Sequence, residues 1–96
     1  MIFLLVSRYT APLERIEELI PAHREYLVRL REAGTLLVSG RRDPWTGGAI
    51  VLRGSRDEAE AAVAADPFTR AGVAETELVA VDPLFWADGL ERYLEA

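Results

Sequence analysis

Residues 35–52, TLLVSGRRDPWTGGAIVL, hold two short apolar runs on either side of a polar loop, and this stretch decides the fold. The runs at 35–40 and 49–52 are each typical of a β-strand. The loop contains an Asp-Pro pair and a Gly-Gly pair, both of which interrupt regular structure. Because the connection is short, we expect the two strands to form an antiparallel hairpin in the middle of the chain.

Upstream of this hairpin, the sequence has the spacing of a helix. From residue 13 onward, apolar residues recur at intervals of three, four or seven: Ile16, Ile20, Leu27 and Leu30. Pro21 lies inside this pattern, so we expect one short helix to end there and a second to begin with the proline in its first turn. Gly34 is a typical C-cap for the second of these helices.

Downstream of the hairpin, a capping motif indicates another helix. Ser55 stands three residues before Glu58, which is the spacing of a capping box, and it predicts a helix over residues 56–65. This segment is rich in alanine, so the helix can lie close against a sheet. The Asp66-Pro67 pair ends it, because the residue before a proline is disfavoured in the helical conformation.

Apolar runs at the two ends of this unit complete the sheet. Residues 2–6 are typical of a strand buried on both faces at the centre of a sheet. Residues 73–81 predict the last strand. The order βαββαβ defines the ferredoxin-like α+β fold, a four-stranded antiparallel sheet with both helices on one face. We assign residues 1–83 to this domain and residues 84–96 to a C-terminal amphipathic tail with helical spacing.

The sheet is expected to carry apolar residues on both faces, although the helices cover only one. A chain of 96 residues has a modest core, so association would add to its stability. A second copy of the chain is the simplest cover for the helix-free face, and we therefore expect a homodimer. A buried ligand or cofactor at that face is the alternative.

The polar composition narrows the chemistry. The chain has no cysteine, 11 basic residues that are all arginine, and one histidine, which excludes thiolate nucleophiles and lysine Schiff bases. Its net charge of −5 and pI of about 4.8 argue against a nucleic-acid partner. The N-terminal apolar run lacks the features of a signal peptide, and no run reaches the ~20 residues of a membrane span. We expect a cytoplasmic protein with no membrane partner.

The single histidine, His23, is the first candidate for proton transfer near neutral pH. It lies on the apolar stripe of the first helical segment, where a polar side chain needs a partner or a cavity. Asp66 follows the second helix, which lies beside the first in this topology, and an Asp–His pair orients an imidazole for acid–base catalysis. From the residues alone two alternatives stay open: a core histidine bonded to backbone, and an aspartate that only forms a turn.

The hairpin loop offers two guanidiniums and one indole, from Arg41, Arg42 and Trp45. Such a set can hold an acidic or aromatic ligand by ion pairing and stacking. The alternative is an exposed loop whose tryptophan packs across a dimer interface. We expect no metal site, because Glu25 lies two residues from the only histidine and side chains with that spacing face different directions on a helix.

Short motifs follow one another in a fixed order along residues 1–83: Pro21-Ala22-His23, Tyr26-Leu27, Leu30, Gly34, Ser39-Gly40, Gly47-Gly48, Asp66-Pro67-Phe68 and Ala71-Gly72-Val73. In this order they resemble the YCII-related (YciI-like) family of small bacterial proteins. The resemblance implies a ferredoxin-like domain that pairs face to face as a dimeric α+β barrel, similar in build to muconolactone isomerase. It also implies a His–Asp site beside a pocket at the barrel edge, which falls on His23 and Asp66.

With the resemblance, we expect catalytic roles for His23 and Asp66. The predicted substrate-binding residues are Ser39, Gly40, Arg41, Arg42, Trp45 and Phe68. Family members often have proline where Arg41 stands, which favours a more acidic substrate here. The expected activity is isomerase or lyase chemistry on a small cyclic or aromatic anion, without a cofactor or a bound metal. The alternatives are a non-catalytic ligand-binding or interaction module and a cofactor-free oxygenase on the same barrel.

Overall fold

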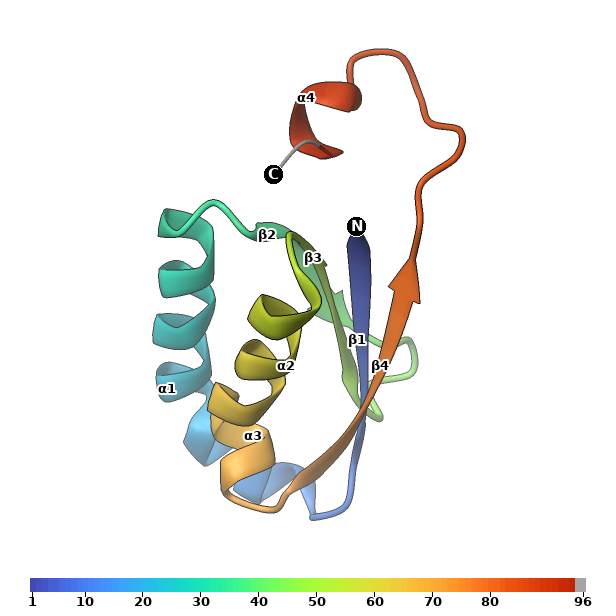
Figure 1. Cartoon of the computed structure of the whole chain (residues 1–96). Coiled ribbons are helices and arrows are strands. Elements are labelled where there is room, and N and C mark those ends of the chain that lie inside the picture. The colour runs from blue at the N-terminus through green and yellow to red at the C-terminus, as the bar shows by residue number, and fades with distance from the viewer. Residues whose placement is uncertain (95–96) are drawn as a thin grey trace.

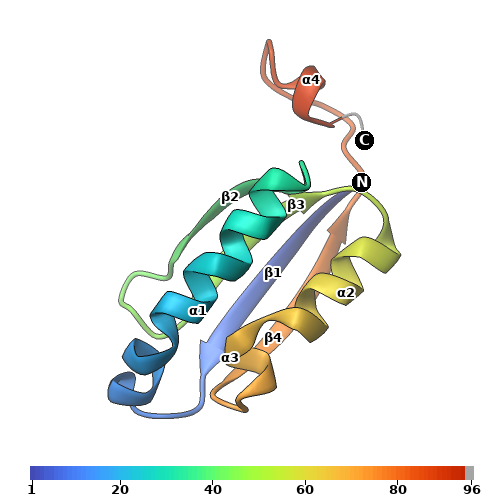
Figure 2. The same ribbon diagram turned by 90° about the vertical axis from the view of Figure 1, so that its left-hand side faces the viewer.

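Four strands form one antiparallel sheet, and the helices that follow β1 and β3 lie together on one of its faces (Figures 1 and 2). The computed structural model describes residues 1–94. Its elements are β1 (Ile2–Tyr9), α1 (Leu13–Glu32), β2 (Leu36–Arg41), β3 (Gly48–Arg53), α2 (Arg56–Ala65), α3 (Pro67–Arg70), β4 (Ala74–Val81) and α4 (Glu91–Leu94). In space the strands run β2-β3-β1-β4, which confirms the ferredoxin-like arrangement. Among the described residues, no helix has the length and apolar character needed to cross a membrane.

β1 is a central strand, as predicted, and it is longer than its apolar run. It pairs with β3 through residues 2–6 and with β4 through residues 2–9, in both cases antiparallel. The pairing with β4 therefore extends the strand beyond the apolar residues that identified it. Ser7 and Tyr9 join the sheet in this way, on the same side as the buried Leu5, because side chains alternate along a strand.

Both faces of the sheet carry apolar side chains, as expected, but the helices cover only one of them. On the helix side Phe3 is 1% exposed and belongs to the main core. On the other side one row of cross-strand neighbours runs through all four strands: Val38, Val51, Leu4 and Val79. Val38 is 58% exposed and Val79 is 37% exposed, so this row leaves apolar surface in contact with water.

α1 is one continuous helix of 20 residues, so the expected break at Pro21 is wrong. A proline removes one backbone hydrogen bond and crowds the preceding turn, but Pro21 is exposed and its effect stays local. Ile16 before it and Tyr26 after it are both buried, and this packing keeps the two halves in line. Gly34, with φ of 81°, follows the helix in a Schellman motif, which confirms the predicted cap.

The capping box and the helix over residues 56–65 are confirmed. Ser55 Oγ accepts a hydrogen bond from the Glu58 N–H at 3.1 Å, and Glu58 Oε1 accepts one from the Ser55 N–H at 3.0 Å. The pKa of the Glu58 carboxyl is lowered mainly by its hydrogen bond with the Ser55 backbone and to a smaller extent by its hydrogen bond with the Ser55 side chain. At Asp66 the chain leaves α2 and enters the short helix α3 directly, where the sequence indicated only a turn.

The C-terminal tail holds a short helix, as expected, but this helix is confined to α4 and does not extend back to residue 84. Residues 82–87 have no regular structure, and α4 is a single turn. Gly89 has φ of 88°, outside the helical region, so a helix cannot pass through it. Phe85 is 99% exposed because this segment projects beyond the end of the sheet (Figure 1). Residues 95–96 of the expected tail lie outside the described residues.

Gly47, in the hairpin loop, has no room for a side chain. A Cβ there would lie 1.9 Å from the Ser7 carbonyl oxygen, which belongs to the backbone and cannot swing away. At Gly40 the same addition meets nothing within 4 Å. We predict that Gly47→Ala lowers the free energy of unfolding by about 1–3 kcal/mol. Gly40→Ala should change it by less than about 0.5 kcal/mol. Urea unfolding measures both, and equal midpoints for the two variants would contradict the prediction.

Candidate active site

A cavity of about 270 Å³ lies between α1 and the helix-covered face of the sheet. Residues of all four strands line it on one side, and residues of α1, the hairpin loop, α3 and the junction between α2 and α3 line the rest. Sites for drug-sized molecules measure roughly 300–1,000 Å³. The space therefore suits a smaller ligand, of about one ring.

His23 and Asp66 come together at the wall of this cavity. His23 Nε2 lies 3.5 Å from Asp66 Oδ2, within ion-pair range but longer than the about 2.7–3.2 Å of a good hydrogen bond. The side chains are 17% and 8% exposed, so the pair is largely withdrawn from water. Among residues 1–94, no three histidine, cysteine, aspartate or glutamate side chains gather as metal ligands do.

Asp66 owes its position to the junction of two helices. It is the C-cap residue of α2 and the N-cap residue of α3, with Pro67 in the first helical position after it. Oδ1 accepts a hydrogen bond from the Phe68 N–H at 2.8 Å, which leaves Oδ2 toward His23. Asp66 therefore has both of the roles considered from the sequence. Its Oδ1 stabilises the turn between the two helices, and its Oδ2 faces the histidine.

Phe68 fixes the plane of the imidazole. The rings of His23 and Phe68 stack with centroids 4.1 Å apart and an interplanar angle of 9°. Tyr26, one helical turn beyond His23, lies on another side with a centroid distance of 5.5 Å. The Asp-Pro-Phe motif thus supplies both the carboxylate that faces the imidazole and the ring against which it packs.

The far wall of the cavity consists of Trp45, Tyr9 and Arg41. Trp45 Nε1–H donates a hydrogen bond to the Tyr9 hydroxyl at 2.7 Å, and the Tyr9 ring meets Phe68 edge to face. The Arg41 guanidinium lies 3.8 Å from the centroid of the Trp45 ring. Trp45 therefore packs within its own chain, and a run of ring contacts joins the guanidinium to the imidazole.

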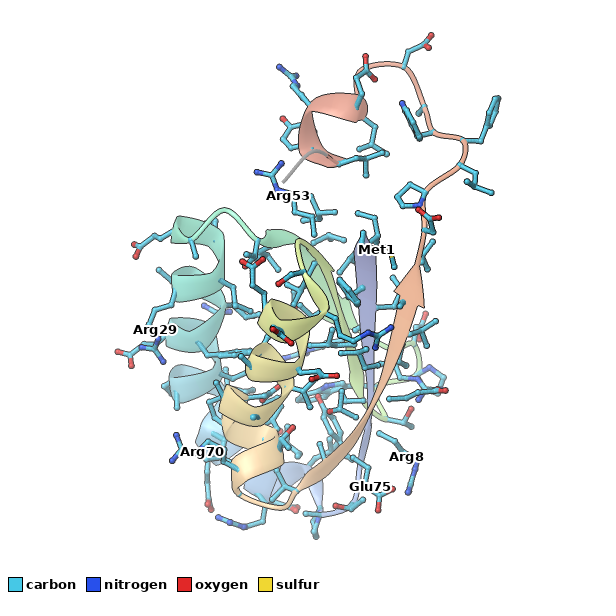
Figure 3. The ribbon with its side chains drawn as sticks, in the orientation of Figure 1. Met1, Arg8, Arg29, Arg53, Arg70 and Glu75 are labelled. Atoms are coloured by element: carbon cyan, nitrogen blue, oxygen red, sulfur yellow. The ribbon has the colours of Figure 1, made fainter. Side chains whose placement is uncertain are left out.

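The structure brings most of the predicted site residues to the cavity. Those that line it are His23, Asp66, Ser39, Gly40, Arg41, Trp45 and Phe68. Arg42 instead borders a separate hollow on the helix-free face, close to the paired Arg8 and Glu75 that Figure 3 labels. Consecutive residues of an extended chain point to opposite sides, which explains why Arg41 and Arg42 separate.

Further residues that line the cavity were missed from the sequence, among them Ser7, Tyr9, Arg24 and Thr76. Ser7 and Tyr9 follow the apolar run of β1, and the alternation of side chains from Leu5 onward would have pointed to them. Thr76 lies opposite Ser7 in the register of β1 and β4, which only the pairing of distant strands reveals.

These features define a class: small ferredoxin-like α+β domains with a histidine–aspartate pair at a cavity between the first helix and the sheet. The YCII-related domain matches residues 1–82, and the chain belongs to this family. The resemblance drawn from its short motifs is confirmed. No match was found among curated proteins.

Among solved structures, the chain is similar to 5-chloro-2-hydroxyhydroquinone dehydrochlorinase from Burkholderia phenoliruptrix AC1100, in a complex with 2,5-dihydroxybenzoquinone. The two chains are 26% identical, and the similarity covers 85% of this chain and 94% of the other. The TM-score of 0.72 shows that they share their fold.

Tyr26 links the stability of the domain to pH. It is 3% exposed, and its hydroxyl donates a hydrogen bond to the Ala62 carbonyl at 2.7 Å. Burial, and then the negative charge of Asp66, raise the pKa of Tyr26 above its ordinary value of 10.0. The folded protein therefore holds the phenolic proton more tightly than the unfolded chain does. This contribution to stability is complete below pH 10.0 and is lost as the pH rises above it.

We predict that Tyr26→Phe lowers the free energy of unfolding by about 1 kcal/mol near pH 7, because one buried hydrogen bond is removed. Between about pH 9 and pH 11, the stability of this variant should decline less than that of the wild type. Tyr93→Phe, at an exposed position, is the matched control. Urea unfolding across this pH range makes the comparison. Parallel declines in the wild type and Tyr26→Phe would contradict the assignment.

Proposed function

We propose that this chain is an enzyme that transfers a proton on a small cyclic or aromatic anion, as an isomerase or a lyase does. The observation that carries the proposal is the contact between His23 and Asp66 at the cavity wall. A well-placed imidazole contributes about 10²–10⁴-fold to such a step. Catalytic hydrogen bonds are often long before substrate binds, and the 3.5 Å separation is consistent with this.

Asp66 acts as a positioning residue for His23. With Nε2–H directed toward Oδ2, Nδ1 is the ring nitrogen left to accept a proton from the substrate. The carboxylate then stabilises the imidazolium that forms. In an isomerisation the proton returns to another atom of the same molecule. In an elimination a leaving group departs with its electron pair, and the proton passes to solvent.

The similarity to a dehydrochlorinase supports the elimination in particular. The name of that enzyme describes removal of a proton and a chloride from a hydroxylated aromatic ring. In this chain Phe68 and Trp45 provide apolar walls, Ser39 and Gly40 line the side formed by β2, and Arg41 carries the charge for an anion. The proton transfer itself calls for no cofactor.

The direct test is the release of chloride from 5-chloro-2-hydroxyhydroquinone, followed by ion chromatography. We predict that His23→Asn lowers the rate by at least about 10²-fold, because an amide cannot take up and return the proton. Asp66→Asn should lower it less, since an amide oxygen can keep the bond from the Phe68 N–H but loses the charge beside the imidazole. Glu25→Gln, an exposed change on the same helix, is the control.

Circular dichroism of each variant separates loss of activity from loss of structure. A folded His23→Asn variant that releases chloride at the wild-type rate would contradict the enzymatic proposal. A compound that binds the wild type and is recovered unchanged would favour a non-catalytic ligand-binding module.

We also propose that two copies of the chain pair through the helix-free face. The row of Val38, Val51, Leu4 and Val79 offers an apolar surface that a second copy can cover with the same residues. Analytical ultracentrifugation should give about twice the chain mass of 10.7 kDa. Val79→Asp should shift the protein to the monomer, because the charge would be buried in the interface.

Val28→Asp is the matched control for this experiment. Val28 is 38% exposed on α1, close to the 37% of Val79, but it lies on the helical layer. This variant should sediment like the wild type. A dimer that survives Val79→Asp but dissociates with Val28→Asp would place the interface on the helices instead.

A further inference from the structure

Two arginines bring positive charge to the cavity without a carboxylate to neutralise it. Arg24 of α1 and Arg41 of β2 both line the cavity. Within residues 1–94, neither forms an ion pair, whereas Arg8 and Arg15 are paired with glutamates. The carboxylate that lines the cavity, on Asp66, is already directed at the Phe68 N–H and at His23. The arginines therefore leave a local excess of positive charge in a chain whose net charge is −5.

Arg41 is held so that its hydrogen-bond donors stay available. Its guanidinium stacks on the face of the Trp45 ring, 3.8 Å from the centroid, and Trp45 is in turn bonded to the Tyr9 hydroxyl. Stacking uses the face of a guanidinium and leaves the N–H groups along its edge free. The stack also fixes the orientation in advance, so less side-chain entropy is lost when a ligand binds.

The wall of the cavity relates this guanidinium to the reacting imidazole. Arg41 contacts Trp45, Trp45 meets Tyr9, Tyr9 meets Phe68, and Phe68 stacks on His23. His23 and Arg41 line the same cavity, so a ligand that fills it contacts both the imidazole and the guanidinium. The cavity, at about 270 Å³, has room for little more than one ring.

We propose that Arg24 and Arg41 bind a carboxylate carried by the substrate, so that this chain prefers a hydroxylated aromatic acid to an uncharged hydroxylated ring. The proposal rests on the proposed function for the reaction and adds the substrate class. A carboxylate is planar and accepts two parallel hydrogen bonds from a guanidinium edge, which matches the donors that the stacked Arg41 presents. Arg24, which the sequence did not single out, supplies the second charge.

The test compares two compounds of the same shape and different charge, 2,5-dihydroxybenzoate and 2,5-dihydroxybenzamide, by isothermal titration calorimetry of the full chain at low salt. We predict that the acid binds at least about tenfold more tightly than the amide, since hydrogen bonds between charged groups are worth about 1.5–3 kcal/mol. Arg24→Gln and Arg41→Gln should each reduce this preference. Arg41→Lys should also reduce it, because an ammonium keeps the charge but lacks the planar fork.

Arg29→Gln is the matched control, because it removes one positive charge from the same helix. Figure 3 shows Arg29 directed away from the sheet on the outer side of α1. This variant should keep the wild-type preference for the acid. Equal affinities of the wild type for the two compounds, or no measurable binding of either, would overturn the proposal.

A second measurement separates this proposal from the proposed reaction. His23→Asn should keep the preference for the acid, because the guanidiniums supply it, while losing turnover. If the wild type prefers the acid but shows no turnover that depends on His23, the carboxylate site is supported and the proposed reaction is contradicted. If turnover depends on His23 but the acid is not preferred, the proposed reaction is supported and the carboxylate site is contradicted.

Discussion

The Asp66 carboxylate holds two parts of the molecule at once. Oδ1 accepts the Phe68 N–H at 2.8 Å, and Oδ2 lies 3.5 Å from His23 Nε2. A charge that is 6% exposed is costly unless its oxygens find partners, so these contacts are conditions of the fold as well as features of the site. Because Asp66 also ends α2 and begins α3, the same side chain sets the path of the backbone and the position of the imidazole.

The two faces of the sheet have different surroundings, because side chains along β1 point alternately to one face and to the other. One set of side chains, from Phe3 to Tyr9, supports the core and the cavity beneath α1. The other set leaves the row through Leu4 without a covering layer. The His23–Asp66 pair and the cavity therefore lie on the helical side, whereas the proposed association would use the opposite side, so a change on one face need not disturb the other.

Local signals in the sequence were sufficient for most of the fold. The capping box at Ser55 and the glycine at position 34 act through neighbouring residues, and both were predicted correctly. The continuity of α1 depends on packing and was not predicted: Pro21 stays inside one helix, with buried residues before and after it. For the site, the His23–Asp66 contact was expected from the resemblance, whereas Arg24 and Thr76 reach the cavity only through tertiary structure.

The central position of β1 has a consequence for how the chain folds. Ile2 pairs with Val81, so the first strand of the domain completes its hydrogen bonds only when the last strand arrives. Such pairing between distant segments raises the contact order and slows folding relative to a helical protein of the same size. During synthesis, β1 must wait with one edge open until β4 has emerged. The same neighbourhood brings the two ends of the domain together, so a short linker could join them in a circular permutant that opens at an exposed loop.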